Sequence, residues 1–150
     1  MDGNKLLERL TSQSGDPILR LDGRLLASSR DPRKEAKQWL DQLRPMISSS
    51  DRGLVIGVGS GYHLAALNLE FPRARVLAIT LEGELIDAVR GIHGLNVANA
   101  EFYACESEAQ VLNSSRVRTF LKSTVCMASH LPSQAANPVA YQEVLARLKM

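Results

Sequence analysis

The sequence predicts an α/β fold in which helices cover both faces of a parallel sheet. From Gly53 onward, short apolar runs of strand length alternate with segments whose apolar residues recur at helical spacing, and this alternation is typical of parallel sheets. The run 54–58 is largely apolar, as expected for a central strand that is buried on both sides. At 150 residues, 45% of them hydrophobic, the chain is long enough for one packed core. We expect a cap over residues 1–30 and an α/β domain over residues 31–150, packed as one compact unit.

The segment before residue 31 has two features. Leucines at positions 6, 7 and 10 follow helical spacing, so we expect a short helix within residues 2–11. Asp22 and Gly23 separate two apolar runs, and an Asp-Gly pair in that setting is a strong signal for a tight hairpin turn. We therefore predict a small two-stranded hairpin across residues 17–27.

The next helix is predicted to begin at Asp31-Pro32, because Asp is a favoured N-cap and Pro is favoured at the first helical position. Its apolar face includes Trp39, and we expect Pro45 and the polar cluster 48–51 to end it. The remaining expected elements, in chain order, are a helix from Leu64 to Phe71, a strand at 75–80, a helix over Leu85–Val89 followed by Gly91 and Gly94, a strand within 96–105, a helix within 109–121, a strand at 124–129, and a helix opened by Asn137-Pro138.

Three glycines lie where the first parallel strand is expected to turn into a helix: Gly57, Gly59 and Gly61. Glycine lets a ligand approach the main chain closely, and free N–H groups at such a turn attract anionic or strongly polar groups. Rossmann-like sheets hold nucleotide-type cofactors in this way. The dinucleotide fingerprint G-x-G-x-x-G would need a glycine at Tyr62, so a dinucleotide is disfavoured. The G-x-G-x-G spacing resembles S-adenosylmethionine-dependent methyltransferases, although Val55 stands where those enzymes usually carry an acidic residue.

The carboxyl ends of the predicted strands supply the other candidate binding residues, because ligands of open parallel sheets sit beyond those ends. Glu82 follows the second strand and is placed to accept hydrogen bonds from a ribose diol. Ser129-His130 ends the last strand, and Cys105-Glu106-Ser107 ends the third. The predicted site therefore comprises Gly57, Gly59, Gly61, Tyr62, Glu82, Ser129 and His130, with a nucleotide, a nucleotide sugar or S-adenosylmethionine as ligand and no metal ion.

Each of these candidates also has a purely structural interpretation. The glycines could serve only the close packing of strand and helix, and Glu82 could simply begin the next helix, where a carboxylate favours the positive end of the helix dipole. His130 could be a loop residue that hydrogen-bonds the backbone, and for this residue we give the functional and the structural interpretation equal weight. His93 lies between two glycines, and we expect it to be inert in a surface turn. His63, in a first helical turn, could be exposed.

Composition excludes several classes of function. The net charge of +2 is too small to indicate nucleic-acid binding, and a solvated helix face explains the basic group within residues 30–37. No apolar stretch is long enough to span a membrane, and the polar N-terminus does not resemble a signal peptide. Cys105 and Cys126 form neither a Cys-x-x-Cys pair nor a zinc motif, and we expect Cys126 to be a buried free thiol. A reduced, cytoplasmic setting is expected.

Two stretches resemble the motility-associated factor (Maf) proteins, which are glycosyltransferases linked to bacterial flagellin modification. Residues 26–36 look like the segment S-x-x-D-P-x-x-E-A that precedes the glycine loop in that family, and Gly61-Tyr62-His63 resembles the Tyr-His after it. The tail from His130 to Tyr141 resembles the end of the family's N-terminal Rossmann-like domain, so the similarity spans residues 17–149. On this resemblance the transferase site would lie in a larger domain, similar to sialyltransferase-type folds, that would begin where this chain stops.

Three functions stay open on the sequence. The first is a Rossmann-like binding domain that holds a nucleotide-like ligand at residues 57–61, with Glu82 on the ribose. The second is a minimal S-adenosylmethionine-dependent methyltransferase, which Glu82 favours and Val55 disfavours. The third is a non-catalytic interaction module that docks on a separate glycosyltransferase or forms a homodimer. Whether the chain is an enzyme is left open.

Overall fold

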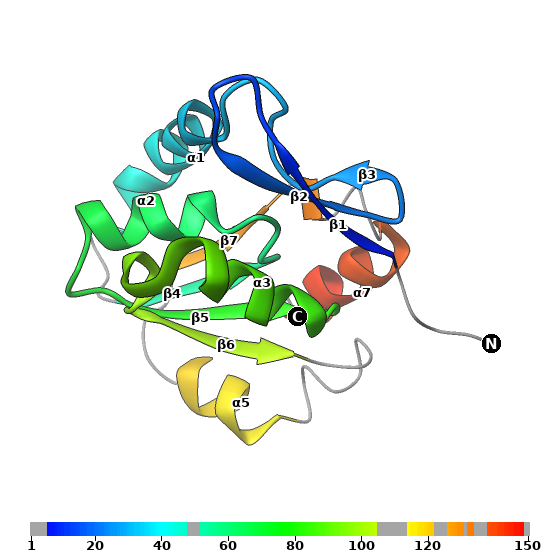
Figure 1. Ribbon diagram of the computed structural model, residues 1–150. Helices are drawn as coiled ribbons and strands as arrows, with labels where there is room; N and C mark the ends of the chain where they lie inside the picture. Colours follow the sequence, from blue (N-terminus) through cyan, green and yellow to red (C-terminus); the bar gives the residue numbers. More distant parts are fainter. Residues whose placement is uncertain are drawn as a thin grey trace.

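The computed structural model describes residues 6–47, 52–104, 114–121, 126–130, 132–133 and 138–148. Figure 1 shows the course of the chain through these ranges. The elements, in chain order, are β1 (Leu7–Thr11), β2 (Pro17–Leu21), β3 (Arg24–Leu25), α1 (Pro32–Ile47), β4 (Arg52–Ile56), α2 (Tyr62–Glu70), β5 (Arg75–Thr80), α3 (Glu84–His93), the 3-10 helix η1 (Gly94–Val97), β6 (Ala100–Ala104), α5 (Ser115–Leu121), β7 (Cys126–Ser129) and α7 (Pro138–Leu148).

The strands form two sheets. Four strands pair in parallel in the order β6-β5-β4-β7, and three pair antiparallel in the order β1-β2-β3. The α/β class and the parallel sheet are therefore confirmed. Along the chain, β5 and β6 extend the larger sheet on one side of β4, whereas β7 returns to its other side. The strand order thus reverses between β4 and β7.

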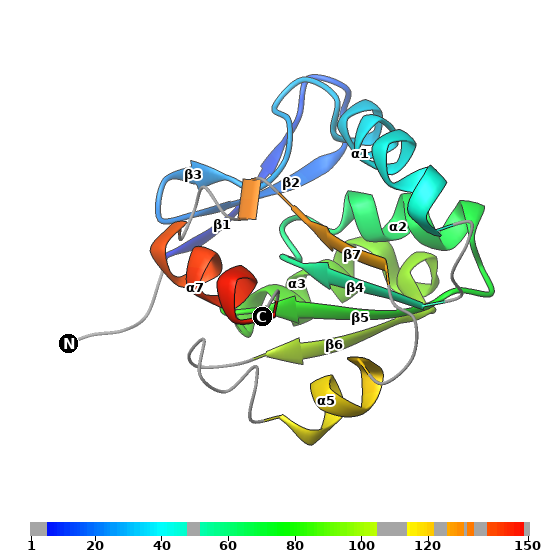
Figure 2. The same ribbon diagram turned by 180° about the vertical axis from the view of Figure 1, so that it is seen from behind.

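Alternate residues of the central strands face two different hydrophobic clusters. Val55 and Ala78 share a cluster with residues of α1, α2 and α3, whereas Ile56 and Ile79 pack with residues of α5 and α7. Figure 1 shows α2 and α3 in front of the sheet, and Figure 2, from behind, shows α5 and α7 over the opposite face. Because both faces are covered, every position of such a strand can be apolar, which explains the apolar run in the sequence.

The expected helix within residues 2–11 is wrong, because this segment contains strand β1. Leu7–Thr11 pairs antiparallel with Pro17–Leu21, from Leu7 opposite Leu21 to Thr11 opposite Pro17. A single short helix is marginal in water because its first turn is costly to form. Pairing with β2 instead provides hydrogen-bond partners for the backbone along five residues, and it half-buries the side chain of Leu10.

The expected hairpin is confirmed at Asp22-Gly23. Both residues adopt left-handed backbone angles, with φ of 50° and 81°, as the tightest hairpin turns require. Leu21 and Arg24 pair across the turn. The small sheet has three strands where the sequence predicted two, because β1 adds to the hairpin.

The predicted start of α1 is confirmed, but Pro45, one of the two features expected to end the helix, does not end it; the other, the polar cluster 48–51, lies outside the described residues. Asp31 Oδ1 accepts a hydrogen bond from the Lys34 amide at 3.1 Å, which is the N-cap interaction expected of Asp. Pro45 lies inside the last turn and the helix continues to Ile47. Ile47 is only 1% exposed, so its burial holds a turn that the sequence alone would end at the proline.

Several other boundaries differ from the expected ones. The helix α3 runs through Gly91 to His93, and η1 precedes the strand predicted within 96–105. Part of the helix predicted within 109–121 is present as α5, and the strand predicted at 124–129 is present as β7. Residues 105–113, which include the candidate Cys105-Glu106-Ser107, and the expected N-cap Asn137 lie outside the described residues, as does the side chain of Cys126.

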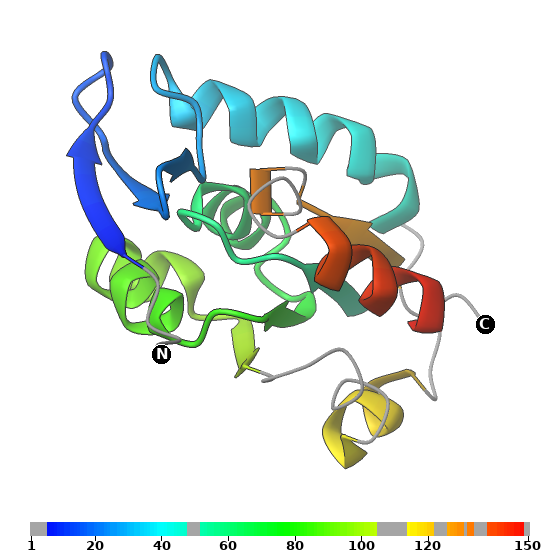
Figure 3. The same cartoon turned by 90° about the vertical axis from the view of Figure 1, so that its right-hand side faces the viewer.

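The small sheet packs against the loop that follows β4. The Ser60 amide donates to the carbonyl of Leu26 at 3.3 Å, and the Leu19 amide donates to Ser60 Oγ at 3.0 Å. Figure 3 shows the N-terminal strands to one side of this loop and α1 above the loop. The carboxyl ends of the parallel strands are therefore covered on one side by the N-terminal segment and α1.

Candidate functional site

The glycine loop between β4 and α2 uses its main-chain amides within the protein. Gly57 N–H donates to the carbonyl of Ile79 at 2.8 Å, and Gly61 N–H donates to that of Val58 at 3.0 Å. The Ser60 amide is bonded to Leu26, as described above. Three of the loop amides that were predicted to bind an anion therefore already donate to carbonyl groups of the protein.

The space above the three glycines is also filled by the protein. Gly57, Gly59 and Gly61 have φ of 108°, 54° and 87°, a region that other residues rarely adopt. A Cβ at Gly57 would lie 2.6 Å from Ser133 Cβ, and a Cβ at Gly59 would lie 2.5 Å from His130 Cε1. A Cβ at Gly61 would lie 2.6 Å from Val89 Cγ1. Close packing therefore requires these glycines, and their contact with a ligand stays a prediction.

Two histidines stack beside this loop. The rings of His63 and His130 are parallel within 7°, with centroids 3.8 Å apart, and the ring of Trp39 meets His63 edge-on at 5.1 Å. Trp39 Nε1 donates to the carbonyl of Ser129 at 3.0 Å. His63 Nε2 lies 2.9 Å from the carbonyl of Gly57, and since a carbonyl can only accept, this nitrogen carries the proton.

Both stacked imidazoles are neutral near pH 7. The pKa of His63 is lowered from 6.5 to about 4, mainly by burial; the hydrogen bond to the Gly57 carbonyl opposes this shift, and the nearby His93 adds to it. Burial likewise holds the pKa of His130 well below 6.5, with a second contribution from His63. His130 Nδ1 is 2.8 Å from Ser133 Oγ, which holds the ring in place. Neutral rings at 3.8 Å can stack, whereas two charged rings would repel each other.

A cleft of about 430 Å³ opens next to the stacked rings. One wall is the inner side of α1 and the segment before it, and the other is formed by residues that follow β4 and β7. The cleft therefore lies beyond the carboxyl ends of these two strands. Its lining consists of Leu26, Ala27, Pro32, Glu35, Ala36, Gln38, Trp39, Gln42, Ser60, Tyr62, His63, His130 and Pro132.

Residues 26–36 form part of the α1 wall of this cleft. Ser28 Oγ accepts from the Asp31 amide at 3.2 Å, and Asp31 caps the helix. Glu35 Oε1 accepts from the Ser28 amide at 3.0 Å, so the carboxylate reaches back from the helix to a residue three positions before its cap. These contacts fix the first turns of α1 to the segment that precedes the helix.

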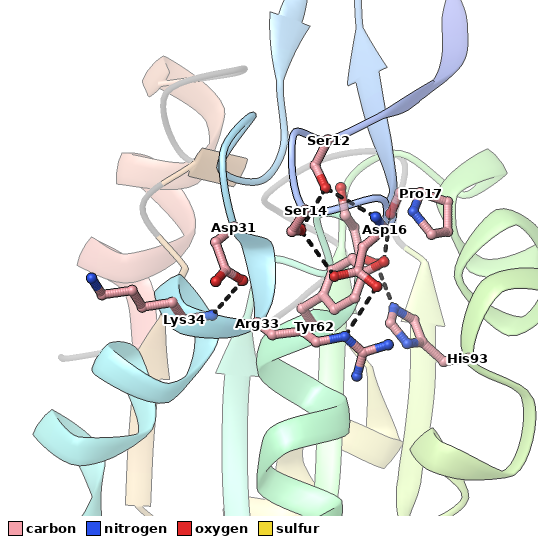
Figure 4. A network of polar contacts seen from close by, with 10 residues as sticks. Ser12, Ser14, Asp16, Pro17, Asp31, Arg33, Lys34, Tyr62 and His93 are labelled. Carbon is pink, nitrogen blue, oxygen red and sulfur yellow. Dashed lines mark hydrogen bonds and ion pairs between the residues drawn. The ribbon is translucent and has the colours of Figure 1, made fainter.

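Tyr62 joins α2 to the N-terminal sheet (Figure 4). Its hydroxyl donates to the carbonyl of Pro17 at 2.6 Å. The guanidinium of Arg33 lies 5.7 Å from the centre of its ring and also pairs with Asp16 at 3.1 Å. Burial, and secondarily the Asp16 carboxylate, raises the pKa of the phenol. Tyr62 thus has a structural role in addition to lining the cleft.

The expectation that His93 lies inert in a surface turn is wrong. It belongs to the last turn of α3, is 8% exposed, and its Nε2 lies 2.8 Å from the carbonyl of Ser60. Its ring also meets that of Tyr62 edge-on, with centroids 4.5 Å apart. A glycine on either side suggested a turn, but Gly91 lies inside the helix and Gly94 ends it.

Glu82 is held by other parts of the protein and does not line the cleft. Its side chain is 4% exposed, and Oε2 accepts from the Tyr141 hydroxyl at 2.6 Å and from Thr80 Oγ1 at 3.2 Å. The Leu81 amide donates to the same hydroxyl at 3.1 Å. Burial and the Glu82 carboxylate raise the pKa of Tyr141, which keeps the phenol protonated as a donor. A ribose contact of Glu82 stays a prediction.

Replacing Tyr141 by Phe is expected to lower the free energy of unfolding by about 2 kcal/mol, because it removes a donor to a buried carboxylate and an acceptor for a backbone amide. Tyr103 belongs to the margin of the same hydrophobic cluster, so Tyr103→Phe is the matched control and is expected to change the free energy by less than about 0.5 kcal/mol. Urea denaturation of the three proteins measures the difference. Equal losses in the two variants would show that the Tyr141 hydroxyl contributes nothing specific.

The structure brings together only some of the residues that the sequence singled out. Tyr62 and His130 line the cleft, whereas Glu82 lies away from it. The three glycines belong to the packed loop, and the Ser129 carbonyl accepts a hydrogen bond from Trp39. The sequence did not single out His63 as a lining residue, nor the six lining residues of α1, of which four form a group of polar and aromatic side chains. A signal for the α1 group exists, because its members recur at i, i+3, i+4 and i+7 along one helix face; they are Glu35, Gln38, Trp39 and Gln42.

Comparison with known proteins returns neither a matching family model nor a matching curated protein. Within the described ranges, no three His, Cys, Asp or Glu side chains are grouped so that they could hold a metal ion. No helix in the described part of the chain has the length and apolar character needed to cross a membrane.

Proposed function

We propose that this chain is a Rossmann-like binding domain, similar to the N-terminal domain of Maf proteins, that holds a nucleotide-like small molecule in the cleft between α1 and the glycine loop. The observation that carries the proposal is the position of the cleft. It lies at the carboxyl ends of β4 and β7, between which the strand order reverses. Open parallel sheets bind their ligands in the crevice at such a reversal.

The chemistry of the lining also supports ligand binding. A volume of about 430 Å³ falls within the usual range for small-molecule sites, which are mostly apolar with a few polar groups. Here the apolar surface comes from aliphatic residues and Trp39, and the polar groups are two amides, two hydroxyls, a carboxylate and the imidazoles. Flat rings such as nucleobases stack on aromatic side chains, so the indole is a suitable surface for one.

The sequence contains one tryptophan, and Trp39 lines the cleft, so intrinsic fluorescence reports directly on this site. We expect at least one of S-adenosylmethionine, S-adenosylhomocysteine, CMP, a CMP-sugar and NAD to change the fluorescence saturably and to release or absorb heat in calorimetry. Trp39→Ala is expected to weaken binding in calorimetry at least about tenfold, because it removes the ring against which a base stacks.

Met46 is the matched control position, because it lies on the same helix, is 51% exposed, and is not among the lining residues. Met46→Ala is expected to bind with the affinity of the unmodified protein. Circular dichroism and thermal unfolding confirm that both variants are folded. The proposal fails if no ligand of the set produces heat or a fluorescence change at millimolar concentration.

A further inference from the structure

We infer that the cleft accepts a nucleoside-type ligand without a phosphate group, an inference that rests on the proposed function and specifies its ligand. A nucleotide-binding Rossmann-like site normally offers a phosphate either free amides at the glycine loop or a cationic side chain. The described lining of this cleft has no Lys or Arg, three of the loop amides already donate to carbonyls of the protein, and the polar groups of the lining suit hydroxyls and ring nitrogens instead.

Several main-chain amides of the glycine loop are already used within the protein. The amides of Gly57, Ser60 and Gly61 all donate to carbonyls of the protein, at 2.8 to 3.3 Å. A phosphate could bind them only by breaking bonds that also join β4 to β5 and to the N-terminal sheet. Gly59 is covered from the other side, because His130 lies where its Cβ would project. The loop therefore has the sequence of an anion-binding turn, but three of its amides are bonded to carbonyls of its own chain.

The positions of the charged side chains on α1 also disfavour a phosphate in the cleft. Among the described residues that line the cleft there is no Lys or Arg, and the one charged group is the Glu35 carboxylate. Three of the four cations of α1 lie on its other side, where Arg33, Lys37 and Arg44 line a separate groove between α1 and α2. A phosphate in the cleft would thus leave water and meet a carboxylate without a compensating cation, which is unfavourable.

The imidazoles cannot supply the missing charge at neutral pH. His63 and His130 are 2% and 5% exposed, and their burial favours the neutral form. His63 already uses Nε2 on the Gly57 carbonyl, and His130 uses Nδ1 on Ser133. A dianionic phosphate has no charged partner in either ring.

The groups that do line the cleft match a nucleoside. The indole of Trp39 offers a surface for a base, and the amides of Gln38 and Gln42 can both donate and accept hydrogen bonds. One oxygen of Glu35 accepts from the Ser28 amide, and we assign the other, Oε2, to a hydroxyl or amino group of the ligand. Of the ligands considered above, S-adenosylmethionine and S-adenosylhomocysteine carry no phosphate, whereas CMP-sugars and NAD do.

The test compares nucleosides with their own monophosphates. Adenosine and AMP, and cytidine and CMP, are titrated while the fluorescence of Trp39 is followed at neutral pH. We expect at least one nucleoside to bind at least about tenfold more tightly than its monophosphate, because the phosphate adds nearly two negative charges without a partner.

A gain-of-function variant makes the test sharper. Gln42 is exposed on α1 at the edge of the cleft, so Gln42→Lys adds a cation there without disturbing the core. The ratio of the affinity for the nucleoside to that for its monophosphate is expected to fall at least about threefold, because the added cation attracts the phosphate. Gln142 is exposed on α7 and is not a lining residue, so Gln142→Lys adds the same charge elsewhere and is expected to leave the preference unchanged.

The outcomes separate this inference from the proposed function. A monophosphate that binds as tightly as its nucleoside, or a preference that Gln42→Lys and Gln142→Lys shift equally, overturns the inference and leaves a nucleotide-binding cleft. If no nucleoside or monophosphate changes the fluorescence or produces heat at millimolar concentration, the proposed function fails with it.

Discussion

Gly59→Ala is expected to lower the free energy of unfolding by roughly 2–5 kcal/mol. The residue has a φ of 54°, and a left-handed conformation costs about 1–2 kcal/mol for a residue with a Cβ. The added methyl would lie 2.5 Å from His130 Cε1 and 3.1 Å from the carbonyl oxygen of Leu26. Crowding of this kind in a packed interior costs about 1–3 kcal/mol more. Neither neighbour can yield easily, because His130 is stacked on His63 and Leu26 is held by main-chain bonds.

Gly23→Ala separates the conformational cost of a left-handed residue from the cost of crowding at Gly59. Gly23 also has a positive φ, 81°, but a Cβ there would meet nothing within 4 Å, so only the conformational cost of about 1–2 kcal/mol applies. Adding His130→Ala to Gly59→Ala is expected to recover part of the loss, because the double variant removes the clash. Urea denaturation of the four proteins measures these differences. Equal losses in the two single glycine variants would show that the space above Gly59 is not closed.

These glycines show how far the sequence could predict the site. Their spacing correctly located a tight turn between a strand and a helix, because the need for positive φ is local. What fills the space above them is not local. Ser133 and His130 approach from about 70 positions later in the chain, and a pattern of neighbouring residues carries no information about such contacts. A ligand and a side chain of the same protein impose the same demand for glycine, so the sequence could not distinguish them.

The fold was more predictable than the site. Strand β5 was placed at its observed bounds, because alternate residues face two covered sides and the whole run must be apolar. Strand β1 was missed, because three leucines at helical spacing fit a helix until the pairing with β2 is known. The helical face of Glu35 and Trp39 was present in the sequence, but only packing against the β4 loop makes it the wall of a cleft.

Acidification is expected to lower the free energy of unfolding between about pH 6.5 and pH 4, before most carboxylates titrate. Burial lowers the pKa of His63 from 6.5 to about 4 and that of His130 well below 6.5. In the unfolded chain both imidazoles regain a pKa near 6.5 and bind protons that the folded protein excludes. Stability is therefore complete above pH 6.5 and is lost as the pH falls through this window. For His63 alone the difference corresponds to about 3 kcal/mol.

His63→Gln tests the cause of this loss. The glutamine amide can still donate to the carbonyl of Gly57 but does not titrate, so the variant is expected to lose less stability than the unmodified protein between neutral pH and pH 5 in urea denaturation. The dependence is reduced and not abolished, because His130 stays buried. Trp39→Phe is the matched control: it removes the hydrogen bond to Ser129 from the same cluster without changing a titratable group. Its pH dependence is expected to equal that of the unmodified protein, and an unchanged slope in His63→Gln would exclude His63 as a source of the acid sensitivity.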